Sequence, residues 1–269
     1  MSAASVQTQP SGPDSIEQHN DRIDKLLDGV GFDGLDVEAI LKWTADAFDP
    51  ARVVLNTSFQ MAGVAMIHMV ASARLPIRIA TIDTLRLPAE THTFIQQIQE
   101  RYGIDIEIQR PETEKIERMV RRFGEYLFFD GKHLQEHCCK VRKVDPNNEL
   151  MKSADCWISG IRRDQSALRH QTPKAMSATE YGSKRKILRL NPMADWSLDR
   201  LQAFVDENDV PQHPLYAQGY QSIGCVICST PTLPGEDPRA GRWRWFNSPE
   251  DVDAQDAKEC GLHIPMYNI

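Results

Sequence analysis

The sequence predicts an α/β fold in which a mostly parallel sheet carries helices on both faces. Two observations support this fold: short β-branched runs alternate with helical patterns as far as Leu190, and the chain is long enough for one sizeable core. With 269 residues, of which 41% are apolar, the chain is too short for two large domains. In such folds a ligand binds beyond the carboxyl ends of the strands.

The individual elements follow from local patterns. Four of the five expected strands are short runs rich in Val, Ile and Leu. The second expected helix has Pro88 near its first turn, where proline is tolerated. The expected strands are residues 52–55, 77–82, 104–108, 156–159 and 187–190. The expected helices are residues 61–73, 88–102, 112–123, 131–141 and 197–207.

The chain divides into three regions by composition. Residues 1–17 are polar, with Ser, Gln and Pro, and we expect them to be disordered. Residues 18–246 form the main domain, which ends in an irregular region rich in Pro, Gly and Trp over 211–245. Residues 247–259 are acidic without apolar periodicity, so we expect 247–269 to be a flexible tail that carries Cys260.

Charge and hydropathy limit the classes of ligand and partner that this protein could bind. No segment approaches the roughly 18 consecutive apolar residues of a membrane span, and the N-terminus lacks the apolar core of a secretory signal, so we expect a cytoplasmic protein with no membrane partner. The net charge of -7 argues against nucleic-acid binding. However, residues 140–189 contain twelve Lys and Arg against five Asp and Glu, which favours a small anionic ligand. For residues 184–186, a solvated turn is an equal alternative.

Two cysteine pairs suggest a metal centre. Structural disulfides are rare in the cytoplasm, so Cys225 and Cys228 could be half of a zinc site, a redox pair or half of an iron-sulfur site. Cys138 and Cys139 are adjacent, too close for an unstrained disulfide. Neighbouring side chains diverge, and a 4Fe-4S cubane offers each thiolate its own iron, which favours the cluster over zinc. That Cys138 and Cys139 are simply buried apolar residues stays open.

The other candidate ligands and nucleophiles are less informative. Cys156 lies inside an expected strand and is interpreted as a structural thiol. His133 and His137 are one helical turn apart before the cysteine pair, where a solvated helix face is favoured over a metal site. Cys260 has Lys258 and His263 nearby, cations that could lower the pKa of its thiol, although an incidental tail cysteine is the alternative.

Several segments resemble the assimilatory adenylylsulfate and phosphoadenylylsulfate reductases of the iron-sulfur type. The resemblance extends from about Val53 to His263. It implies an adenine nucleotide alpha hydrolase-like fold of the PP-loop type and a 4Fe-4S cluster held by Cys138, Cys139, Cys225 and Cys228. The segments are CCKVRKV (138–144), WISGIRRDQS (157–166), GYQSIGC (219–225), RAGRW (239–243) and ECGLH (259–263).

The resemblance also assigns roles to single residues. Cys260 is expected to be the nucleophile. The residues expected around the sulfate are Lys143, Arg239, Arg242 and His263, and Gly160 is expected on the nucleotide. Arg162 and Arg163 are expected at its phosphate, with a surface ion pair as an equal alternative for Arg163. The loop after the first strand is expected to receive phosphate through Thr57, Ser58, Phe59 and Gln60, and the loop after the second to meet adenosine through Asp83, Thr84 and Leu85. Gln60 and Leu85 stand where relatives have Gly, which alters both loops.

The resemblance implies an oxidoreductase of sulfate assimilation and cysteine biosynthesis that reduces adenosine 5'-phosphosulfate to sulfite and AMP. Cys260 would carry the sulfonate as S-sulfocysteine, and thioredoxin or glutaredoxin would release sulfite. Reductases that keep the cluster cysteines mostly use this substrate. The alternatives are phosphoadenylylsulfate or both nucleotides as substrates, an adenylating tRNA-thiolating PP-loop enzyme with an iron-sulfur cluster, and a zinc-stabilised binding module. The sequence is compatible with a homo-oligomer.

Overall fold

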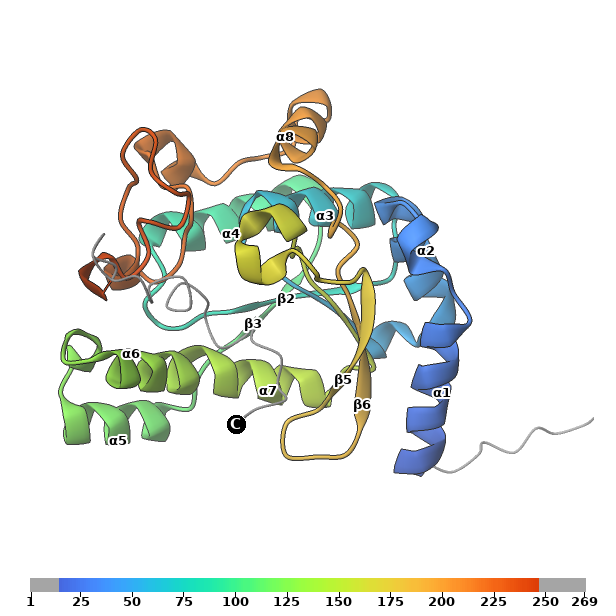
Figure 1. Ribbon diagram of the computed structural model, residues 1–269, viewed down its shortest axis with the longest axis horizontal. Helices are drawn as coiled ribbons and strands as arrows, with labels where there is room; N and C mark the ends of the chain where they lie inside the picture. The colour runs from blue at the N-terminus through green and yellow to red at the C-terminus, as the bar shows by residue number, and fades with distance from the viewer. Residues whose placement is uncertain (1–14, 247–269) are drawn as a thin grey trace, which may run out of the picture.

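The computed structural model describes residues 15–246 and consists of one twisted sheet with helices on both faces (Figure 1). The strands are β1 (Val53–Asn56), β2 (Arg78–Ile82), β3 (Ile106–Gln109), β4 (Cys156–Ile158), β5 (Ala175–Thr179) and β6 (Lys186–Leu190). The helices are α1 (Ile16–Asp28), α2 (Val37–Ala47), α3 (Met61–Ser72), α4 (Ala89–Tyr102), α5 (Thr113–Phe123), α6 (Lys132–Cys139), α7 (Asp145–Lys152) and α8 (Leu198–Glu207). The predicted fold class is confirmed.

The six strands have the order β3-β2-β1-β4-β6-β5. All neighbours are parallel except the pair β5 and β6, which forms an antiparallel edge. The chain proceeds outward from β1 to β3 and then returns to place β4 on the other side of β1. A crevice forms where the strand order reverses in this way, so a ligand site is expected beyond the carboxyl ends of β1 and β4.

Alternating side chains of the strands pack into two hydrophobic clusters, one on each face of the sheet. Val53 and Leu55 point to one face, where they join the main apolar cluster with α2, α3, α4 and α8. Val54 points to the other face and packs in a smaller cluster with Leu150 and Met151 of α7. This period of two explains why the predicted strands read as continuous apolar runs: both of their faces are covered.

Four elements were not predicted. The starts of α1 and α2 have side-chain caps, Ser15 and Asp36, whose oxygens accept backbone N–H groups. The N-terminal stretch expected to be disordered therefore ends in the start of α1; residues 1–14 lie outside the described residues. Pro146 lies in the first turn of α7, where proline is tolerated. The edge strand β5 carries little apolar signal, and pairing with β6 defines it.

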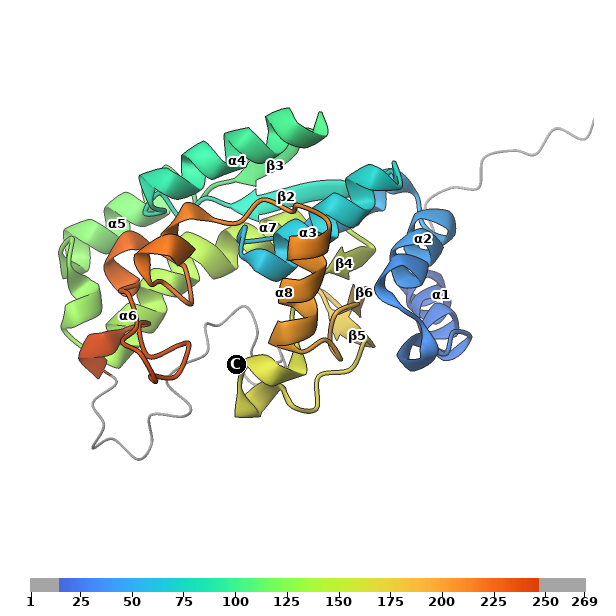
Figure 2. The same ribbon diagram turned by 90° about the horizontal axis from the view of Figure 1, so that it is seen from above.

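The predicted helix over 131–141 is part of a longer helical path. α6 passes through a π-helical turn, Lys140–Val144, directly into α7. π-helical turns often occur at functional sites because they change which side chains face a cavity. The irregular region after α8 is confirmed: it has short 3-10 turns, including Val226–Cys228, and lies beside α6 in both views (Figures 1 and 2).

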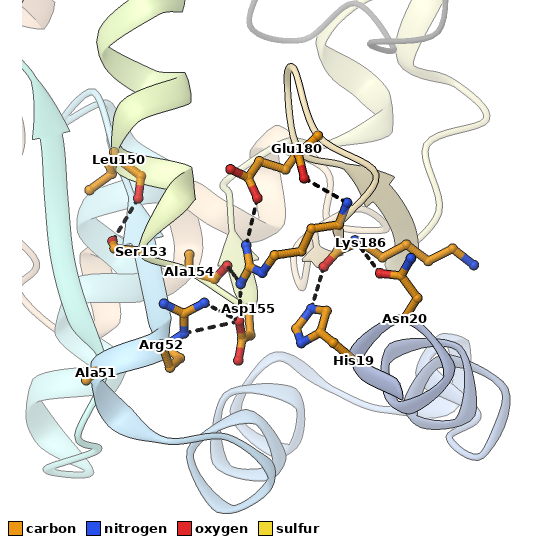
Figure 3. Close-up of polar contacts among 12 residues, drawn as sticks. His19, Asn20, Ala51, Arg52, Leu150, Ser153, Ala154, Asp155, Glu180 and Lys186 are labelled. Carbon is orange, nitrogen blue, oxygen red and sulfur yellow. Dashed lines mark hydrogen bonds and ion pairs between the residues drawn. The ribbon is translucent and has the colours of Figure 1, made fainter. Parts of the chain in front are cut away.

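Ion pairs at the amino ends of the strands account for some of the excess Lys and Arg in residues 140–189 (Figure 3). Asp155, just before β4, accepts hydrogen bonds from Arg52 (2.7 Å to Nη2) and from Arg185. Arg185 also pairs with Glu180, and Lys186 with Asp24. Of residues 184–186, Arg185 and Lys186 thus stabilise the fold at the end opposite the predicted site. No helix among the described residues is long and apolar enough to cross a membrane.

Candidate functional site

A cavity of about 930 Å³ lies at the carboxyl ends of β1, β2 and β4, where the strand order predicts a site. Its volume is in the range typical of small-molecule sites. The loops after these strands form one wall, and α6 with the turn Val226–Cys228 forms another. The cavity therefore joins the predicted nucleotide loops to the predicted cluster region.

The loop after β1 leads into α3 as expected for a phosphate-binding turn. Thr57 and Ser58 line the cavity, and Thr57 Oγ1 accepts the N–H of Phe59 at 3.0 Å. Phe59 has a φ of 57°, a strained conformation for a bulky residue that is often found at functional sites. Its ring is fully buried against Phe94 and does not line the cavity, so only its backbone can face a ligand.

Gln60 lines the cavity, but both polar ends of its side chain bind the protein. Its Nε2 donates to Ser58 Oγ at 3.0 Å, and its Oε1 accepts the N–H of Ile223 at 3.2 Å. The side chain thus connects the loop after β1 with the segment that precedes Cys225.

The loop after β2 differs from the expectation in two of its three residues. Asp83 is buried and holds the loop by accepting the N–H of Leu85 at 2.9 Å and pairing with Arg110. Leu85 has a φ of 59° and a side chain that is 49% exposed, and neither residue lines the cavity. Thr84 does: its Oγ1 lies 3.2 Å from Sγ of Cys225. The adenosine-side loop therefore contacts a cysteine directly.

The four predicted cluster cysteines, Cys138, Cys139, Cys225 and Cys228, line the same cavity. No disulfide joins any of the five cysteines within the described range, and there no three Cys, His, Asp or Glu side chains converge on a point where one metal ion could bind. A cubane does not require such convergence, because each thiolate binds a separate iron around the cluster. Four cysteines around one cavity match the number of thiolate ligands that a four-iron cluster takes.

The environment of the thiols is apolar and cationic. Burial raises the pKa of Cys228 to about 12 and also raises the pKa of Cys138, so both thiols need a positively charged partner to ionise. Arg142 and Arg86 are the nearby cations that act against burial at Cys138. Within the described residues, Nε of Arg142 and Nη1 of Arg86 are buried without a hydrogen-bond partner. These donors suit the sulfurs of an anionic cluster.

The expected sulfate and phosphate residues fall into two groups. Lys143, Arg162, Arg239 and Arg242 line the cavity. Arg163 does not: its Nε donates to the carbonyl of Thr172, and its guanidinium faces Asp33. The role of Arg163 at the substrate stays a prediction, which these contacts with Thr172 and Asp33 do not support.

Gly160 lines the cavity at a point where the chain segments approach closely. A Cβ atom there would lie 3.1 Å from Cβ of Ala62 and 3.3 Å from the backbone nitrogen of Gly63. Glycine thus lets the loop after β4 pack against the start of α3. Cys260 and His263 lie outside the described residues.

Three further cations line the cavity that were not predicted from the sequence: Arg86, Arg142 and Arg169. Arg142 is 5% exposed and its Nη1 donates to the carbonyl of Thr84 at 3.1 Å. It follows the adjacent cysteines within the segment 138–144, which was the available signal. Altogether seven Lys and Arg but only three Asp line the described part of the cavity. Such a surplus of positive charge suits a polyanionic ligand.

Cys156 and His133 are placed as interpreted, whereas His137 is half-buried and not on a solvated face. Cys156 is fully buried in the sheet, which confirms a structural thiol, and burial raises its pKa well above the ordinary value. His137 packs against the ring of Phe123, and neither His133 nor His137 lines the cavity.

Comparison with known proteins agrees with this geometry. Residues 52–231 match the phosphoadenosine phosphosulfate reductase domain family. The adenosine 5'-phosphosulfate reductase of Agrobacterium fabrum is 36% identical over 231 residues, which cover 86% of this chain and 84% of that protein. The reductase of the same name from Allochromatium vinosum is 38% identical, over 78% of each chain. The crystal structure of the phosphoadenylyl-sulfate reductase from Candida auris covers 82% of this chain and 100% of its own with a TM-score of 0.60; at 23% identity it supports the fold alone.

Proposed function

Because the chain belongs to the phosphoadenosine phosphosulfate reductase domain family, we propose that it reduces adenosine 5'-phosphosulfate to sulfite and AMP. The observation that carries the proposal is the cavity itself. It combines two nucleotide loops, a surplus of cations and two cysteine pairs in one space. A protein that only bound nucleotides would not need the cysteines.

The thiolate of Cys260 forms a bond to the sulfate sulfur while the bond from that sulfur to the phosphate oxygen breaks. AMP leaves with the electron pair, and the enzyme keeps an S-sulfocysteine. A dithiol protein, thioredoxin or glutaredoxin, then supplies two electrons: one thiolate attacks the Cys260 sulfur and expels sulfite, and the second thiol resolves the mixed disulfide. The regenerated Cys260 thiol is ready for another turnover.

The cations of the cavity lower the barrier to the first step. Thiolate and phosphosulfate are both negative, so their approach is unfavourable unless fixed positive charge surrounds them. Lys143, Arg239 and Arg242 line the cavity and suit the sulfate. Arg162 and Ser58 lie on the strand loops and suit the phosphate.

Cys138, Cys139, Cys225 and Cys228 would hold a 4Fe-4S cluster. When bound, the cluster supplies fixed charge and ties the two cysteine pairs together. Arg142 fits a further task of this chain, since its buried guanidinium reaches both the cysteine region and the carbonyl of Thr84. It would stabilise the thiolates and keep the loop after β2 in place.

The test uses the Cys260→Ser variant. We expect it to form no sulfite while it keeps the brown absorbance of the cluster and about four irons and four sulfides per chain. Sulfite production by this variant would disprove the mechanism. Competition between adenosine 5'-phosphosulfate and its 3'-phosphorylated form on the wild-type enzyme then identifies the preferred nucleotide.

A further inference from the structure

Gln60 and Ser58 form a hydrogen-bonded pair at the mouth of the phosphate loop, and the direction of each bond can be assigned. A backbone N–H can only donate, so the atom of Gln60 that faces the N–H of Ile223 at 3.2 Å must be the amide oxygen. The other end of the amide, the NH₂ group, must then face Ser58 Oγ at 3.0 Å. The amide orientation is therefore fixed by a contact between segments 163 residues apart.

The fixed amide determines what the Ser58 hydroxyl can do. An NH₂ group only donates, so Ser58 Oγ accepts from Gln60 and its single proton must point elsewhere. Ser58 is exposed, lines the cavity, and donates to no other group within the described residues. Its proton is thus available to a ligand in the cavity.

We propose that Gln60 is a positioning residue that makes Ser58 a dedicated hydrogen-bond donor to the phosphate group of the bound nucleotide. The proposal rests on the proposed function for the identity of the ligand. The substrate phosphate carries only acceptor oxygens at neutral pH, so a hydroxyl with its proton directed into the cavity binds it better than one free to rotate. The hydrogen bond to Ile223 also links the phosphate loop to the segment just before Cys225. This link keeps the two walls of the cavity in a fixed relative position.

Binding measurements on the iron-loaded protein test the pair without requiring turnover. The probes AMP and adenosine are titrated by calorimetry into the wild type and the Ser58→Ala, Gln60→Ala and double variants. Adenosine 5'-phosphosulfate is titrated into the same four proteins in a Cys260→Ser background, because Cys260 would otherwise react with it. We expect each single variant to weaken binding of both phosphorylated probes three- to tenfold. The double variant should lose less than the product of the two single losses, because the contact of the Ser58 proton can be lost only once. Adenosine, which has no phosphate, should bind all four proteins equally.

Gln60→Glu is the sharpest variant, because it keeps the oxygen that faces Ile223 but replaces the donor by an acceptor. Ser58 would then donate to the carboxylate, and AMP affinity should fall at least as far as in Gln60→Ala. The Ser58→Ala/Gln60→Glu variant has no Ser58 hydroxyl to redirect. Its AMP affinity, compared with that of Ser58→Ala, therefore measures only the repulsion between the new carboxylate and the phosphate. Gln96→Glu, on the exposed face of α4, is the matched control and should bind AMP as the wild type does.

Two results would overturn the inference: additive losses in Ser58→Ala/Gln60→Ala, or an equal loss of adenosine binding. A wild-type protein that fails to bind adenosine 5'-phosphosulfate would instead contradict the proposed function. The two failures are therefore distinguishable.

Discussion

The α-carbon of Gly224 lies directly against the guanidinium group of Arg242. A Cβ atom on Gly224 would come within 2.5 Å of Nη2 and 2.7 Å of Cζ of Arg242. The guanidinium cannot move aside without cost, because its Nε donates to the carbonyl of Cys228 at 3.0 Å and its Cζ lies 4.7 Å from the centre of the Trp243 ring. Glycine before the cysteine pair thus fixes the place of a cation in the cavity.

Replacing Gly224 by Ala should displace Arg242 and lower kcat/KM for sulfite formation roughly 10- to 100-fold, since a misplaced cation no longer stabilises the transferring group. In an Arg242→Ala background the same change should have almost no further effect. Gly34→Ala is a suitable control, because a Cβ atom there meets nothing within 4 Å. Wild-type rates in Gly224→Ala would contradict the assigned role.

Replacing Cys138 or Cys228 by Ser should remove the cluster, because serine is a poor ligand for iron-sulfur centres. Iron and acid-labile sulfide per chain, measured on anaerobically purified protein, should fall from about four of each to near zero. Cys156→Ala should retain both, since Cys156 is fully buried in the sheet away from the cavity. Full iron content in Cys228→Ser would exclude it as a ligand.

Replacing Gly63 by Ala should disrupt the start of α3. A Cβ atom there would lie 1.9 Å from Oγ1 of Thr57, the oxygen that accepts the N–H of Phe59. We expect the free energy of unfolding to fall by about 1 to 3 kcal/mol and AMP binding to weaken, because the phosphate loop must shift. Urea denaturation and calorimetry measure the two effects; an unchanged AMP affinity would show that the loop does not hold phosphate.

Replacing Asp155 by Asn should destabilise the protein in a pH-dependent way. Burial would raise the pKa of Asp155, but Arg52 and Arg185 outweigh it and hold the pKa below its usual value. A depressed folded-state pKa contributes stability above the unfolded pKa of about 3.9 and loses it as pH falls through the folded value. The deficit of the variant should be about 2 kcal/mol at pH 7 and should shrink below about pH 4.

Urea denaturation between pH 3 and pH 7 follows this deficit. Asp24→Asn is the matched control, because Asp24 pairs with Lys186 in an ion pair that is more exposed than that of Asp155 and should be worth less than about 1 kcal/mol. A deficit for Asp155→Asn that is the same at pH 3 and pH 7 would contradict the electrostatic explanation.

Local patterns were sufficient for most of the fold because the parallel strands are covered on both faces and therefore form continuous apolar runs. All five predicted strands are present, with bounds within two residues. The unpredicted strand β5 has no fully buried residue and depends on pairing with its partner β6. The missed helix α7 depends on the π-helical turn before it, which no local pattern in the sequence indicated.

The sequence by itself determined the order of the core elements, the two cysteine pairs and the family resemblance, because these depend on residue type and spacing along the chain. The tertiary structure decided which cations share the cavity: Arg142, Arg86 and Arg169 line it, whereas Arg163 faces Thr172 and Arg185 pairs with Asp155. It also fixed the amide of Gln60 through Ile223 and the guanidinium of Arg242 against Gly224. These relationships join segments far apart in the chain, and only packing decides which of them meet.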